Sequence, residues 1–132
     1  MSRCFDVSTS TPWGKADYAT RFARGITFYN TPGHGGFKLS KGLNETIPFD
    51  FRTATWAGLG VNGWYEEDCD AQIVIVFFPQ HFSAEQVSAA HEALKASRYL
   101  AIPYARHFTC TDPIQDGDAS QNVSLARLQE TQ

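Results

Sequence analysis

Short alternating segments separated by glycine-containing turns constrain this chain more than any other feature. Residues 17–23 alternate apolar and polar side chains, which predicts a half-buried strand. A turn at Gly25 precedes residues 26–29, which are β-branched or aromatic. The alternation resumes at residues 37–39, after the loop Thr-Pro-Gly-His-Gly-Gly at residues 31–36. The pattern predicts three antiparallel strands joined by short turns.

Two later segments predict a buried strand and a helix. Residues 71–78 are mostly apolar and β-branched and end at a proline, which predicts a central strand buried on both faces. Ser83 and Gln86 form a capping box, so a helix is predicted to begin at Ala84. The expected fold class is therefore α+β, a small antiparallel β-sheet with one main helix packed across it.

The remaining segments carry no strong periodicity. The first dozen residues are polar, so ordered structure is expected to start at Trp13. Residues 40–63 contain Pro48 and several glycines, which favours loop. Residues 99–108 predict an edge strand that a proline interrupts.

The length of the chain fits one compact domain. A chain of 132 residues lies within the size of a single domain, which is roughly 100–200 residues. We expect one α+β domain over residues 1–110. Residues 111–132 form a polar C-terminal tail, whose last part can form a short helix around Leu125.

The charge of the chain argues against one class of partner. A net charge of −3 and a pI near 5.7 disfavour a protein that binds the nucleic-acid backbone, so no direct nucleic-acid binding is expected. The charge is uneven, with +3 over residues 1–64 and −6 over the remainder. A basic surface of the first half could accept an anionic ligand, unless folding interleaves the two halves.

Localisation and cofactors are predicted from what the sequence lacks. No export signal begins the chain, and the longest apolar run is far shorter than the roughly 20 residues of a membrane helix. Three widely spaced cysteines fit reduced thiols in the cytoplasm. Because no Cys-x-x-Cys pair or closely spaced histidine pair is present, no metal site and no cofactor are expected.

The glycine-rich turn is the first candidate site. Gly35 and Gly36 permit close backbone approach, so exposed amides and the His34 imidazole could face an anionic or polar ligand. His34 could serve as a donor, an acceptor, a base or a ligand. The alternative is a plain hairpin connection with His34 on the surface. Trp13, between a proline and a glycine, either lines a pocket or packs in the core.

The second candidate site is an aromatic and acidic segment, whose residues are Trp64, Tyr65, Glu66, Glu67 and Asp68. Strand alternation would place Glu66 and Asp68 on one face and Glu67 on the other. Convergent carboxylates could bind a hard cation such as Mg²⁺, hold a histidine, or bond to ribose hydroxyls. The two rings could stack on a planar ligand. The alternative is a solvated acidic turn that protects an aggregation-prone strand.

Three segments resemble a known family when they are taken together. They are Thr-Pro-Trp-Gly at residues 11–14, Thr-Pro-Gly-His-Gly-Gly at residues 31–36 and Trp-Tyr-Glu-Glu-Asp-Cys-Asp at residues 64–70. In this order they resemble an uncharacterised domain family of bacteria, phages and plasmids, with TPWG, (T/S)xGHGG and WYEEDCD motifs. Ala71 stands where that pattern usually has tryptophan, so a pocket lined by that ring would be wider here.

The resemblance implies a role but no reaction. Association with mobile elements suggests a phage or plasmid protein that inhibits a bacterial defence system without catalysis. It would cover a CRISPR effector or sequester a nucleotide signal, so the expected partner is a host defence complex or a small nucleotide, and a homodimer is possible. The alternative is a small enzyme that uses His34 with Glu66, Glu67 or Asp68 as an acid–base pair or metal site on a nucleotide-like substrate. A third interpretation makes both motifs folding devices.

Overall fold

A computed structural model describes residues 3–6 and 9–108 of the chain. Contacts group residues 1–101 into one compact unit and residues 102–132 into a second. Only residues 102–108 of the second unit are described, so the predicted tail with its helix around Leu125 lies outside the described residues. The predicted domain boundary at residue 110 stays a prediction.

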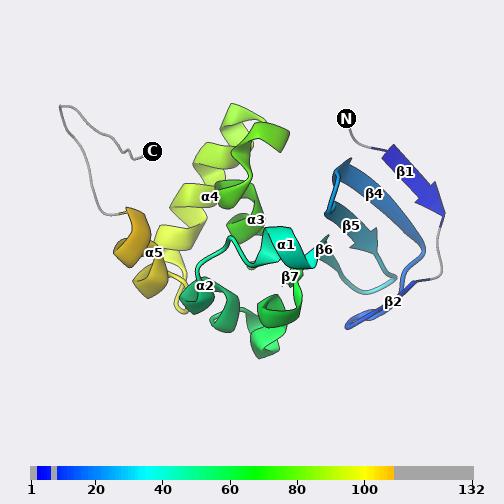
Figure 1. Ribbon diagram of the computed structural model, residues 1–132, viewed down its shortest axis with the longest axis horizontal. Helices are drawn as coiled ribbons and strands as arrows, with labels where there is room; N and C mark the ends of the chain where they lie inside the picture. Colours follow the sequence, from blue (N-terminus) through cyan, green and yellow to red (C-terminus); the bar gives the residue numbers. More distant parts are fainter. Residues whose placement is uncertain (1–2, 7–8, 109–132) are drawn as a thin grey trace. The chain divides into compact units, whose positions relative to one another are not determined.

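The first unit contains a five-stranded antiparallel sheet (Figure 1). Its strands, in spatial order, are β1 (Arg3–Asp6), β4 (Tyr18–Ala23), β5 (Ile26–Asn30), β6 (Gly35–Leu39) and β7 (Trp64–Glu66). A separate two-stranded ribbon pairs β2 (Ser10–Thr11) with β3 (Gly14–Lys15). The three predicted strands and the α+β class are confirmed.

The expectation that order starts at Trp13 is wrong. Strand β1 pairs with β4 along its whole length, and β2 also precedes the tryptophan. The physical reason is that β4 would otherwise present an open row of backbone amides and carbonyls at the edge of the sheet.

Residues 40–63 are largely helical, so the prediction of a loop is wrong. They form α1 (Lys41–Asn44), α2 (Phe49–Thr53) and the 3-10 segment η1 (Trp56–Asn62). The Ser40 hydroxyl accepts a bond from the Leu43 amide at 3.4 Å and caps α1. Pro48 immediately precedes α2, where its fixed φ and missing amide do no harm. The η1 segment ends at Gly63 with φ of 90°, a left-handed geometry that favours glycine.

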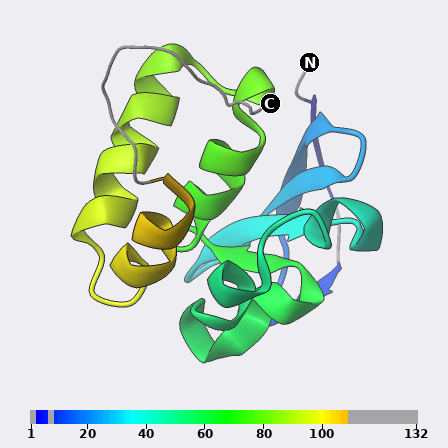
Figure 2. The ribbon, with the colours of Figure 1, turned by 60° about the vertical axis from the view of Figure 1, so that its left-hand side comes forward.

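The predicted central strand over residues 71–78 is also wrong, because this segment forms helix α3 (Ala71–Phe77). A short apolar run has the same pattern in a buried helix as in a buried strand. Residues on several sides of α3 are buried, including Ile73, Val74 and Val76. The helix contacts β6, β7 and α4, and Figure 2 shows it between α4 and the sheet. It is α3, therefore, that joins the helical layer to the sheet.

Helix α4 (Ala84–Ala96) begins where the capping box predicts. The Ser83 hydroxyl accepts from the Gln86 amide at 3.1 Å, and the Gln86 side chain accepts from the Ser83 amide at 2.9 Å. A short 3-10 turn, η2 (Pro79–His81), separates it from α3. The predicted edge strand at residues 99–108 is wrong, because α5 (Ala101–Phe108) is a helix. Its proline lies in the first turn, where no amide bond is lost.

The core of the first unit lies where the sheet meets the helices. Phe37 at the centre of the sheet has three aromatic neighbours, with ring centroids 5.0 Å from Phe28, 5.3 Å from Phe22 and 5.8 Å from Phe82. Such edge-to-face packing adds to the burial of the rings. No helix in the described part of the chain is long and apolar enough to cross a membrane.

Candidate functional site

The His34 turn is fixed by its own backbone and by one side chain. The Thr31 hydroxyl donates to the His34 carbonyl at 2.6 Å and accepts from the His34 amide at 3.0 Å. The Thr31 amide donates to the same carbonyl at 2.8 Å. The His34 imidazole is 56% exposed. The hairpin therefore holds the histidine backbone rigidly while its ring stays accessible to a ligand.

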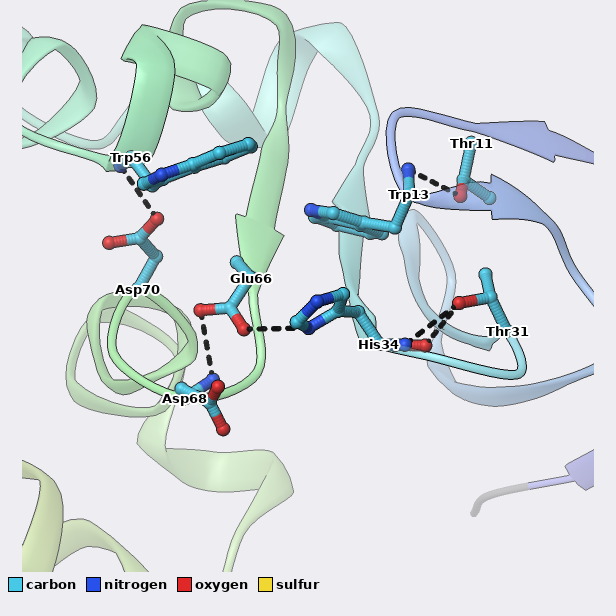
Figure 3. A network of polar contacts seen from close by, with 8 residues as sticks. All are labelled: Thr11, Trp13, Thr31, His34, Trp56, Glu66, Asp68 and Asp70. Atoms are coloured by element: carbon cyan, nitrogen blue, oxygen red, sulfur yellow. Dashed lines mark hydrogen bonds and ion pairs between the residues drawn. The ribbon is translucent and has the colours of Figure 1, made fainter.

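Strand pairing brings the acidic segment to this turn. Glu66 lies opposite Gly36 in the β6–β7 pairing, and the Glu67 amide donates to the Gly35 carbonyl at 2.9 Å. One oxygen of the Glu66 carboxylate accepts from the Asp68 amide at 3.0 Å. The other lies 3.7 Å from Nδ1 of His34 (Figure 3). The expectation that Glu66 and Glu67 face opposite ways is wrong, because β7 ends at Glu66 and the chain turns there.

The carboxyl of Glu66 is partly buried and therefore partly shielded from water. Burial raises its pKa above the usual value, the bond from the Asp68 amide partly offsets this, and the nearby Asp68 charge raises it further. Asp68 itself is exposed, and it acts on Glu66 both through its backbone amide and through its charge.

Three side chains converge with atoms that can bind a metal ion. One ligand atom each from His34, Glu66 and Glu67 lies within 4.8 Å of the other two. Two ligands on one tetrahedral zinc ion are about 3.4 Å apart, given bonds of roughly 2.1 Å. The 3.7 Å between His34 Nδ1 and Glu66 Oε2 is close to that value. Glu67 is exposed, so its side chain can rotate to complete the set.

The two predicted tryptophans, Trp13 and Trp64, pack against each other beside this cluster. The rings of Trp13 and Trp64 meet edge to face with centroids 5.6 Å apart, and Tyr29 lies 5.9 Å from Trp64. The ammonium of Lys38 lies 5.5 Å from the Trp64 ring. The Trp13 indole lies against Gly36, which pairs with Glu66. Both tryptophans are thus packed against other side chains, and only their outer surface can meet a ligand.

Tyr65 lies apart from the cluster. Its side chain is 0% exposed, and its hydroxyl donates to the Asn44 side-chain carbonyl in the core. Burial raises its pKa far above the usual value. Position 65 therefore serves the core, while its neighbours at positions 64 and 66 point the other way, as strand alternation requires.

A cavity of about 310 Å³ on the other side of Glu66 was not foreseen from the sequence. Trp56, Asp70 and Tyr99 line it together with Glu66. Cys69 is exposed and also lines it. The sequence shows aromatic residues at positions 56 and 99, but nothing in their spacing links them to the acidic segment.

Comparison with known proteins gives a family. A family model described as a domain of unknown function matches residues 6–112. The chain belongs to the DUF7007 family. The match spans every residue of the metal-ligand cluster and of the cavity, so both lie within the DUF7007 domain. No curated protein and no solved structure matches the chain. Membership of an uncharacterised family is confirmed, while the motifs as family signatures and the phage or plasmid origin stay predictions.

Proposed function

We propose that this DUF7007 domain binds a divalent metal ion through His34, Glu66 and Glu67 and presents the ion to an anionic ligand. The observation that carries the proposal is the convergence of three ligand atoms within 4.8 Å. They come from two segments far apart in the sequence, the β5–β6 turn and the end of β7.

Preorganisation supports the proposal. The Thr31 bonds fix the histidine backbone, the β6–β7 pairing fixes the backbone of Glu66, and the bond to the Gly35 carbonyl fixes the backbone of Glu67. In metal sites, bonds of this kind orient the ligands before the ion arrives and raise the affinity. The Asp68 amide also occupies one oxygen of Glu66, which leaves the other free for the ion.

The donor set indicates which ions fit. One imidazole nitrogen with two carboxylates suits Zn²⁺, Mn²⁺ or Fe²⁺ better than Mg²⁺ or Ca²⁺, which prefer oxygen alone. Three protein ligands leave at least one coordination position open, as in catalytic zinc sites. That position could take water, a carboxylate or a phosphate group.

Metal titration tests the proposal directly. The full chain, stripped with EDTA, is titrated calorimetrically with Zn²⁺, Mn²⁺ and Mg²⁺. We expect one ion per chain for Zn²⁺ or Mn²⁺ and weaker binding of Mg²⁺. His34→Ala, Glu66→Gln and Glu67→Gln should each weaken binding at least tenfold, within the roughly 10–100-fold typical of perturbed metal sites.

Matched substitutions outside the cluster provide the controls. Glu85→Gln and His107→Ala remove the same chemical groups from exposed positions and should leave metal affinity unchanged. Equal loss of affinity in these controls, or absence of binding to the unmodified chain, would contradict the proposal.

The predicted inhibition of a bacterial defence system stays a proposal that rests on the resemblance. A metal-bound anion site could serve a binder or an enzyme, and stoichiometry separates the two. A binder saturates at a fixed ratio to its target, whereas an enzyme turns over at substoichiometric amounts. His34→Ala and Glu67→Gln can also be tested for inhibition of a defence nuclease. If both variants inhibit as well as the unmodified chain, the inhibition does not depend on the metal site.

A further inference from the structure

The cavity beyond Glu66 has a chemistry of its own. Its walls come from the α2–η1 junction, from the turn after β7 and from the segment that follows α4. Two carboxylates line it, those of Glu66 and Asp70, and none of the lining residues is a lysine, an arginine or a histidine. The cavity is therefore electrically negative, and it disfavours the anionic ligand expected at the open position of the metal.

Asp70 is the unusual member of the lining. Its side chain is 3% exposed, and it accepts the Trp56 amide at 2.9 Å. Burial raises its pKa, while the amides of Trp56 and Glu66 partly offset this. No ion pair with Asp70 is found in the described part of the chain. A buried carboxylate at the wall of a cavity is costly unless a cation compensates it.

Two exposed rings stand at the same cavity. Trp56 is 63% exposed and Tyr99 is 68% exposed, and both line it. Exposed apolar side chains that gather at one place mark interaction sites, whereas scattered ones do not. Ala57, also in the lining, has φ of 56°, a strained value for a residue with a side chain. Strain of this kind is concentrated at functional sites.

We propose that this cavity binds an organic cation, a guanidinium or alkylammonium group, with its charge toward Asp70 and Glu66 and its face or stem against Trp56 and Tyr99. Aromatic faces attract such cations, and the nearby carboxylates supply hydrogen-bond acceptors. The volume of about 310 Å³ is at the lower end of the roughly 300–1,000 Å³ of ligand sites. This volume suits a group of amino-acid size better than a dinucleotide.

The same chemistry could come from a free small molecule or from an arginine side chain of another protein. Two probes distinguish these sources. Agmatine carries a guanidinium and an ammonium at the two ends of a short chain without a carboxylate. A short end-capped peptide whose only charged group is one central arginine presents the guanidinium on a backbone. A neutral probe of similar shape, butylurea, carries neither the guanidinium nor the ammonium and controls for the charge.

Calorimetric titration of the EDTA-treated full chain tests the proposal without metal, so its outcome is independent of the proposed metal site. We expect agmatine, the peptide or both to bind in a 1:1 ratio, and the neutral probe to bind at least tenfold more weakly. Binding by agmatine assigns a small-molecule site, and binding by the peptide alone assigns a protein partner. Failure of both cations, or equal binding of the neutral probe, would overturn the proposal.

Variants locate the cation within the cavity. Tyr99→Ala and Trp56→Ala should each weaken binding by roughly two- to thirtyfold, the range of cation–aromatic contacts. Tyr99 is largely exposed, so its variant keeps the fold even if Asp70→Asn does not. Tyr18→Ala, at an exposed tyrosine outside the cavity, is the matched control and should bind normally. Undiminished binding in both cavity variants would contradict the assignment.

Discussion

The indole ring of Trp13 covers Gly36 so closely that position 36 has no room for a side chain. A Cβ there would fall on the indole and lie 2.5 Å from the Tyr65 carbonyl oxygen. The glycine thus lets a ring from the N-terminal segment pack onto the β6–β7 pair, two residues after His34. Its role at this position is close packing rather than an unusual backbone angle.

Replacing this glycine tests that contact. Gly36→Ala should lower the free energy of unfolding by about 1–3 kcal/mol, because the indole must move and the β6–β7 pairing must widen. Urea denaturation measures the loss. Gly33→Ala is the control, because a Cβ at position 33 meets nothing within 4 Å. A change of equal size at position 33 would show that the cost comes from the backbone and not from Trp13.

Removal of the Tyr65 hydroxyl should destabilise the core. Tyr65→Phe leaves the Asn44 side-chain carbonyl without its donor, while the Asn44 amide keeps its 2.8 Å bond to the Gly60 carbonyl. We expect a loss of about 1–3 kcal/mol in the free energy of unfolding, the cost of one buried unsatisfied polar group. Tyr18→Phe, at an exposed tyrosine, should change stability by less than about 0.5 kcal/mol. Denaturation of the two variants side by side compares them.

The backbone at Ala57 gives a prediction of opposite sign. Its φ of 56° lies in the left-handed region, which costs a residue with a side chain about 1–2 kcal/mol. Ala57→Gly removes this strain, and after the larger chain entropy of glycine is subtracted we expect a net gain of up to about 1 kcal/mol. Ala54→Gly, at a right-handed φ of −81°, should instead destabilise. Thermal denaturation of both variants gives the comparison.

The pH dependence of stability contains a contribution from His91. Burial lowers its pKa below the ordinary value of 6.5, Lys95 lowers it further, and Glu92 opposes both. The unfolded chain therefore takes up this proton at a higher pH than the folded chain. Stability from this group is complete above pH 6.5 and falls as the pH drops below it. Melting temperatures from pH 7.5 to 5 should fall less steeply in His91→Gln, and an unchanged slope would contradict the assignment.

Elements with local signals were predictable from the sequence. The alternation at residues 17–23 and the capping box at Ser83 depend on neighbours along the chain, and the structure confirms both. The prediction of a strand over residues 71–78 was wrong because a short apolar run is compatible with either a strand or a helix. The choice is made by packing, since this segment is buried against the sheet and α4 at once. The helices within residues 40–63 are too short to show a period.

The candidate site, like the fold, was predictable from the sequence only in part. His34 and Glu66 were predictable as separate candidates, because the chemistry of an imidazole or a carboxylate is evident from the residue type alone. Their approach to 3.7 Å was not, because it depends on the register between β6 and β7, which only the folded sheet defines. Three segments meet at the cavity of Trp56 and Tyr99 through tertiary packing alone, so no local sequence pattern predicts it.

The connection between β6 and β7 has a consequence for the order in which the protein assembles. Strands β4, β5 and β6 follow one another through short turns, whereas β7 joins the sheet only after residues 40–63 have intervened. Closing the longer loop costs more chain entropy, so we expect the local hairpins to form first and β7 to be added late. Glu66 and Glu67 arrive with that last strand. An ion or ligand that needs them binds only the completed sheet, and by mass action it holds in place the strand that is hardest to close.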